Sequence, residues 1–256
     1  MIGNLVTILE YIPFNPIRKR ITHNLKVIYS SISNQDIIVI RKKLFKSLGQ
    51  YAAEFVKFIH DKDEIRIEVS NPEKLKQSIR DNEITICLTG HFTGFEFYTT
   101  IPRFFKGGNF IFLFEADPDF EVFNSWICKK RDRGGGTTIS SKEIYRVLLK
   151  KLFAENHSII GSLSDLAPTF NSSIGIFQFL NKKRRIYTGL QRIGYKLNAH
   201  FIYVEIERKC KGNYILCFHD LPSTTIREVT TSYLKLLQDN ITNAPELWLP
   251  MIMYDL

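Results

Sequence analysis

The sequence contains few of the residues that make a disulfide or metal scaffold. It holds only four cysteines, Cys87, Cys128, Cys210 and Cys217, with no Cys-x-x-Cys pair and no regular spacing among them. This spacing favours neither a disulfide framework nor a zinc site, and it fits a protein of a reducing compartment. We therefore expect no metal and no cofactor.

Long hydrophobic runs are also missing. A membrane-spanning helix needs about 20 consecutive apolar residues, and the longest runs here, residues 109–114 and 158–163, have the length of strands. The mildly apolar segment 1–16 precedes the basic cluster 18–20, which is not the order of a secretory signal. Segment 1–16 is interpreted either as an interfacial helix beside a polybasic patch or as a terminal helix packed against the body.

What the chain does have is positive charge and aromatic side chains. Its 256 residues are 44% hydrophobic and 24% charged, which excludes a disordered, collagen-like or polytopic membrane chain. The 35 Lys and Arg outnumber the 26 Asp and Glu, for a net charge of +9, and there are 20 Phe and 11 Tyr. The positive charge indicates an anionic partner: nucleic acid, an acidic protein or a membrane surface.

Hydrophobic periodicity predicts helices that alternate with strands. A single apolar stripe runs along residues 33–60, which predicts a long helix. Beyond it the pattern predicts an α/β fold with a largely parallel sheet flanked by helices, and an N-terminal helical extension. We expect residues 1–60 to form this extension and residues 61–256 the α/β domain, in one structural unit. The expected strands are 65–69, 84–89, 109–114, 158–163, 174–179, 200–207 and 214–219, and the expected helices are 72–80, from about 93, 119–130, 141–156, 188–197 and 225–241.

The segment Thr89–Glu96 carries the clearest chemistry. A buried strand ends at Gly90, His91 follows, and Glu96 comes five residues later, with Gly94 between them. Ligands collect at the carboxyl ends of strands in open α/β sheets. If Glu96 binds one ring nitrogen of His91, the other nitrogen is a general base for a hydroxyl proton. The alternative is a buried histidine that is hydrogen-bonded to backbone.

The same segment resembles a known signature. Gly90-His91-Phe92-x-x-Phe95-Glu96 is similar to the His-x4-Asp/Glu motif of glycerolipid-type acyltransferases, and more narrowly to the Gly-His-x-Gly-Asn-Trp-Glu form in the late acyltransferases of bacterial lipid A biosynthesis. Further blocks resemble that family in the same order. They are Arg18-Lys19-Arg20 with Asn24-Leu25, Asn124 with Arg131-Asp132-Arg133-Gly134, Asp165-Leu166-Ala167-Pro168, Phe179-Leu180-Asn181 with Tyr187-Thr188-Gly189, and Pro245-Glu246-Leu247-Trp248-Leu249.

Several positions depart from the family pattern. Thr93-Gly94-Phe95 replaces Gly-Asn-Trp, and Leu166 replaces a glutamine. The segment 251–256 lacks the usual His/Arg pair, and segment 1–16 is shorter than the family's membrane anchor. These departures concern substrate specificity and reaction rate, whereas the His/Glu pair itself is present.

The resemblance implies a glycerolipid acyltransferase-like domain that transfers a fatty acyl group from an acyl carrier protein thioester to a hydroxyl of a lipid A precursor. It implies His91 as general base, oriented by Glu96. The backbone N–H groups near Gly94 and the guanidinium groups of Arg131 and Arg133 are candidate donors to the tetrahedral oxyanion.

A covalent acyl-enzyme is not expected. Cys87, Ser162 and Ser164 lie on apolar strands, where packing is the simpler role, so direct transfer is favoured. Asp165 is interpreted either as part of a turn that hydrogen-bonds substrate or as a loop cap. The aromatic residues between 92 and 105 either line an acyl channel or pack in the core.

The basic clusters suggest the partners. Two basic clusters bind either lipid phosphates or the acidic carrier protein, or they are a solvated surface. One consists of Lys129, Lys130, Arg131 and Arg133, and the other is the expected turn 182–185. The resemblance places the protein peripherally on the cytoplasmic face of the inner membrane.

Other functions stay open. The same His/Glu chemistry serves transfer to lysophospholipid, glycerol phosphate or another glycolipid, and a non-catalytic lipid-binding homologue is a further alternative. Nucleic acid is not expected as a partner, because the basic residues are dispersed and no nucleic-acid-binding signature is present.

Overall fold

A computed structural model describes residues 16–60, 65–114, 121–141, 143–144, 157–165, 174–253 and 256. The expectation for segment 1–16, and most of the helix expected over 141–156, lie outside the described residues.

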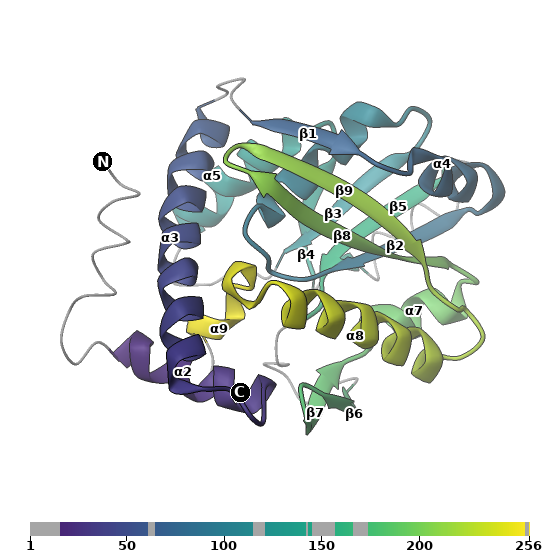
Figure 1. Cartoon of the computed structure of the whole chain (residues 1–256). Helices are drawn as coiled ribbons and strands as arrows, with labels where there is room; N and C mark the ends of the chain where they lie inside the picture. The colour runs from purple at the N-terminus through teal and green to yellow at the C-terminus, as the bar shows by residue number, and fades with distance from the viewer. Residues whose placement is uncertain are drawn as a thin grey trace.

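The centre of the molecule is a seven-stranded sheet in the order β1-β9-β8-β2-β5-β3-β4 (Figure 1). All neighbouring strands run parallel except β8 and β9, which form an antiparallel hairpin. This confirms the α/β fold with a largely parallel sheet. The strands are β1 (Arg66–Val69), β2 (Ile84–Thr89), β3 (Asn109–Phe114), β4 (Thr137–Ser140), β5 (Ser158–Leu163), β8 (His200–Cys210) and β9 (Asn213–Asp220).

Strand β2 lies between β8 and β5, and all six of its residues are buried. Its side chains alternate between two hydrophobic clusters, with Ile86 and Leu88 in one and Cys87 in the other. Burial on both faces explains why this strand is an uninterrupted apolar run.

Helices cover both faces of the sheet (Figure 1). Helices α7 and α8 contribute to the cluster that holds Ile86, whereas α4 and the 3-10 helix η2 contribute to the cluster that holds Cys87. The helices are α4 (Pro72–Asp81), η2 (Phe95–Phe104), α5 (Glu121–Asp132), α7 (Gly189–Lys196), α8 (Ile226–Asn243), η4 (Pro245–Leu247) and α9 (Pro250–Met253).

The N-terminal helical segment consists of α2 (Pro16–Ile28) and α3 (Asn34–Ile59). Helix α3 begins as expected at Ser33, whose hydroxyl accepts the Asp36 N–H. In α2, Asn24 is fully buried and its amide donates to the carbonyl of Met251 at 2.9 Å. The segment shares one hydrophobic cluster with the sheet. The boundary at residue 60 stays a prediction.

Three local expectations differ from the structure. The basic run Lys182–Arg185 is not a turn: it belongs to strand β7 (Lys182–Tyr187), which pairs with β6 (Ile174–Phe179). The turn comes earlier, at Leu180 and Asn181, which have positive φ angles of 49° and 61°. Strand β4 was not expected. The segment after Thr93 forms a 3-10 helix in place of an α-helix, and Pro102 lies inside it.

None of the helices in the described part of the chain is long and apolar enough to cross a bilayer.

Candidate active site

The candidate site lies where β2 and β5 end. The two strands are parallel, and Thr89 is paired with Leu163 in the register. His91 and Asp165 each follow two residues after this pair, so they emerge at the same edge of the sheet. Strand pairing therefore brings together two residues that are 74 positions apart.

His91 and Asp165 are joined by two hydrogen bonds. Nδ1 of His91 lies 2.5 Å from Oδ1 of Asp165, and the His91 backbone N–H donates to Oδ2 at 2.8 Å. The indole N–H of Trp248 also donates to Oδ2, at 2.8 Å. The Asp165 side chain is fully buried, whereas the His91 side chain is 17% exposed. One nitrogen of the imidazole is thus fixed, and the ring remains accessible.

These contacts keep Asp165 ionised. Burial alone would raise the pKa of this carboxyl, but the charge of His91 and the hydrogen bonds from His91 and Trp248 outweigh burial and hold the pKa below its usual value. A carboxylate at this position fixes the imidazole tautomer and stabilises the imidazolium form.

In the structure Glu96 binds Arg131, and the carboxylate that binds His91 is that of Asp165. The two carboxylate oxygens of Glu96 accept from Nε and Nη2 of Arg131, both at 2.8 Å. The physical reason is that His91 ends a strand whose parallel neighbour brings another carboxylate to the ring, while Glu96 lies on η2 and faces α5. The pair raises the pKa of Arg131: burial lowers it, and the hydrogen bond and charge of Glu96 outweigh that effect.

The chain near residue 248 packs against the turn that holds His91, residues 90–94, which we call the His91 turn. The Thr93 N–H donates to the Leu247 carbonyl at 2.7 Å, and the Leu249 N–H donates to the His91 carbonyl at 2.8 Å. Phe92 and Trp248 form an isolated antiparallel bridge. The turn is therefore held at His91, Phe92 and Thr93 by one short segment.

Gly94 allows this turn to form. Its φ angle is 95°, in the left-handed region that favours glycine, and a Cβ atom here would collide with the ring of Tyr214. The N–H groups of His91, Phe92 and Thr93 already have described acceptors. Of the four N–H groups at residues 91–94, that of Gly94 therefore stays the candidate donor to the oxyanion.

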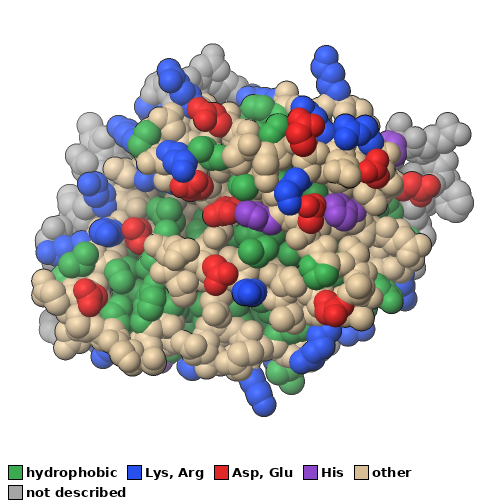
Figure 2. All heavy atoms as spheres, turned by 45° about the vertical axis from the view of Figure 1, so that its right-hand side comes forward, with side chains coloured by type: hydrophobic (Ala, Val, Ile, Leu, Met, Phe, Trp, Pro, Cys, Tyr) green, Lys and Arg blue, Asp and Glu red, His purple; other side chains and the backbone are tan. Residues whose placement is uncertain are grey.

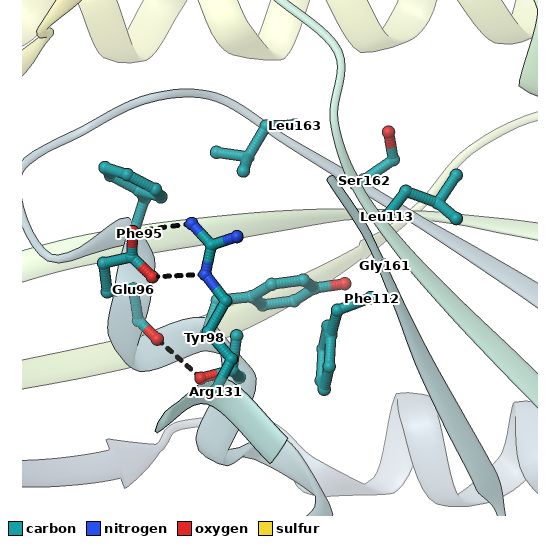
Figure 3. A pocket seen from close by; sticks show the side chains of 10 residues that line it. Phe95, Glu96, Tyr98, Phe112, Leu113, Arg131, Gly161, Ser162 and Leu163 are labelled. Carbon is teal, nitrogen blue, oxygen red and sulfur yellow. Dashed lines mark hydrogen bonds and ion pairs between the residues drawn. The ribbon is translucent and has the colours of Figure 1, made fainter. Parts of the chain in front are cut away.

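A pocket of about 290 Å³, counted with its opening to solvent, adjoins the site (Figure 3). The Phe95 ring lies 5.3 Å from the His91 ring and also lines this pocket. Figure 3 shows the third guanidinium nitrogen of Arg131 pointing away from Glu96 and into the pocket. The lining residues are Phe95, Glu96, Tyr98, Thr99, Phe112, Leu113, Arg131, Gly161, Ser162 and Leu163.

The other residues predicted from sequence have different surroundings. Arg133 is exposed and does not line the pocket. Cys87 is fully buried, which raises the pKa of its thiol to about 12, so it carries no thiolate near neutral pH. Phe97 is buried in the hydrophobic core, whereas Phe95 and Tyr98 line the pocket.

Sequence reasoning missed two roles. The pairing of Asp165 with His91 could have been inferred from the position of Asp165, two residues after a predicted parallel strand. Trp248 belongs to a block singled out by resemblance, but no local pattern connects its indole to Asp165.

The family model for bacterial lipid A biosynthesis acyltransferases matches residues 7–252. The chain belongs to this family. It is therefore an O-acyltransferase that transfers acyl groups onto a lipid A precursor. No curated protein matches the chain.

Proposed function

We propose that this acyltransferase moves a fatty acyl group from an acyl carrier protein thioester to a hydroxyl of the lipid A precursor, with His91 as general base. The observation that carries the proposal is the His91–Asp165–Trp248 arrangement beside the pocket. Nδ1 of His91 is held by Asp165, and the ring is accessible, so Nε2 is the nitrogen that meets substrate.

The reaction proceeds by direct transfer. Nε2 of His91 takes the proton of the acceptor hydroxyl as its oxygen attacks the thioester carbonyl carbon. The tetrahedral intermediate collapses, the C–S bond breaks, and the imidazolium returns the proton to the thiolate. Asp165 stabilises the imidazolium. A general base of this kind accounts for roughly two to four orders of magnitude in rate.

Two groups are suited to stabilise the negative charge on the oxygen of the tetrahedral intermediate. The free guanidinium nitrogen of Arg131 points into the pocket, and the Gly94 N–H lies in the turn after His91. Glu96 acts through Arg131, because its bidentate hydrogen bond fixes the guanidinium plane. Glu96 is thus a positioning residue in this mechanism.

Helix α5 supports peripheral attachment to a membrane. Its outer face carries Val122, 85% exposed, and Trp126, 37% exposed, with Lys130 over the Trp126 ring and Lys129 exposed beside them. Apolar, indole and lysine side chains on one helix face suit the surface of an anionic bilayer. Sedimentation with anionic vesicles measures this attachment, and Trp126→Ala should weaken it more than Tyr195→Ala, another exposed aromatic.

The β6–β7 hairpin supports binding of the acidic carrier protein. Lys182, Lys183 and Arg185 are exposed along β7. Elsewhere on the face seen in Figure 2, Lys and Arg side chains are spread among Asp and Glu side chains. This dispersion does not favour nucleic acid, whose binding uses a continuous basic stripe.

The test is acyl transfer by the full chain, followed by mass spectrometry of the acceptor. His91→Ala should abolish transfer, and His60→Ala, which changes an exposed histidine at the end of α3, should not. Full activity of folded His91→Ala would contradict the mechanism.

The same assay separates the alternatives. Lysophospholipid, glycerol phosphate and other glycolipids replace the lipid A precursor in parallel reactions, and a coenzyme A thioester replaces the carrier thioester. Faster transfer to one of the other acceptors would change the assigned substrate. Binding without transfer to any acceptor would indicate a non-catalytic homologue.

A further inference from the structure

Three potential metal ligands meet on the β8–β9 hairpin, on strands other than those that lead into His91 and Asp165. Glu205 lies on β8, and Cys217 and His219 lie on β9. Glu205 is directly opposite Cys217 in the register, and Tyr203 is opposite His219. Because opposite residues, and residues two apart on a strand, share a face of the sheet, all three side chains project to the same side.

The donor atoms of these side chains converge. Nε2 of His219 lies 2.8 Å from Oε2 of Glu205, and one ligand atom from each of the three residues lies within 4.8 Å of the others. A tetrahedral zinc ion, with bonds of about 2.0 to 2.3 Å, separates its ligand atoms by roughly 3.3 to 3.6 Å. Small side-chain rotations are therefore enough to place all three atoms around one ion.

We propose that Glu205, Cys217 and His219 bind Zn²⁺, with water in the fourth position. One thiolate sulfur, one imidazole nitrogen and one carboxylate oxygen form a ligand set that zinc accepts. The His219 and Glu205 side chains are 34% and 30% exposed, so an ion reaches them from solvent. Binding replaces the Cys217 S–H bond with a Zn–S bond and releases the proton to solvent.

Strand register explains why cysteine spacing gave no sign of this site. The ligand set uses a single cysteine, and its glutamate comes from the neighbouring strand. The bound ion links β8 to β9 beside Tyr203, whose ring packs at 5.8 Å on Tyr233 of α8. We assign the ion a stabilising role in this hairpin and no part in acyl transfer.

The test is Co²⁺ titration of the metal-free full chain, because Co²⁺ adopts zinc geometry and absorbs through thiolate-to-metal charge transfer. One equivalent should produce this absorption, and Zn²⁺ should remove it. Cys217→Ser should lose the absorption, whereas Cys210→Ser, at an exposed cysteine, should keep it. Absence of the band in the unmodified protein, or its survival in Cys217→Ser, overturns the proposal.

A second readout does not depend on the thiolate. A hundredfold excess of Zn²⁺ over its Kd should raise the Tm of the unmodified protein by roughly 5 to 10 °C. His219→Gln and Glu205→Gln should remove this rise. An equal rise in both variants would show that zinc binds elsewhere.

Discussion

Two buried carboxylates in this molecule are held by similar numbers of hydrogen bonds but have opposite surroundings. Asp165 accepts from His91 and Trp248, and the His91 ring packs against Phe95, which lines the pocket. Glu54 of α3 accepts from Arg208 at 2.6 Å, the Gly212 N–H at 2.9 Å and the Tyr214 hydroxyl at 2.5 Å.

The partners decide what each carboxylate does. The Arg208 side chain is 8% exposed, and burial, followed by the hydrogen bond to Glu54, raises the pKa of Tyr214, so this hydroxyl keeps its proton near neutral pH. The Glu54 network therefore attaches α3 to the β8–β9 hairpin. The partner of Asp165 is a histidine whose side chain is 17% exposed and can meet a substrate. Under the proposed mechanism, similar hydrogen bonding serves stability in one place and chemistry in the other.

Of the substitutions that separate these two networks, the replacement of Asp165 should have the largest effect on activity. Asp165→Asn keeps the shape of the side chain but removes the charge that selects the tautomer of His91. We expect kcat/KM to fall by about 10³ to 10⁴, with little change in KM. Steady-state kinetics measures this loss, and Asp81→Asn, at the exposed end of α4, is the control. A loss of less than tenfold would mean that Asp165 does not orient the base.

Replacing Glu54 should have the opposite result, with a loss of stability and little loss of activity. Glu54→Gln leaves the Arg208 guanidinium without its carboxylate in a buried place, which should lower the free energy of unfolding by about 3 to 5 kcal/mol. Urea denaturation measures the change. The kcat/KM of the folded fraction should stay within a few fold of the unmodified enzyme, and a loss as large as that of Asp165→Asn would remove the distinction between the two networks.

A smaller effect is expected at Arg131. Arg131→Lys keeps the positive charge but cannot form the bidentate pair with Glu96, so kcat should fall by roughly 10- to 100-fold. Arg133→Lys, at an exposed arginine that does not line the pocket, should change kcat by less than twofold. Equal effects of the two substitutions would argue against a role for the Glu96–Arg131 pair.

The smallest expected effect is a difference in stability at acidic pH between Asp165→Asn and the unmodified protein. The pKa of Asp165 is lower in the folded protein than its ordinary value of about 3.9, so its stabilising contribution is present above that value and disappears as pH falls through the folded pKa. Asp165→Asn lacks this contribution, so its unfolding free energy should fall less steeply below about pH 4. Urea midpoints across that range measure the slopes, and identical slopes would contradict the shift.

The sequence predicted the elements better than their pairing. The apolar run of β2 and the glycines around His91 identify the His91 turn, because these signals are local. The carboxylate partner of His91 depends on which strand lies beside β2, and that information is not in the five-residue spacing to Glu96. The basic run at residues 182–185 was wrongly interpreted as a turn, because an exposed hairpin strand lacks the apolar alternation of a half-buried one.

The hydrogen bonds between the His91 turn and residues 247–249 have a consequence for the synthesis of the protein itself. A nascent chain that has left the ribosome as far as Asp165 already contains the base and its carboxylate, but it lacks the indole donor and the backbone partners of His91 and Thr93. In the proposed mechanism, the order of translation therefore leaves the site incomplete until Trp248 and Leu249 have been added. An incomplete chain that ends before them meets its substrates without a finished site.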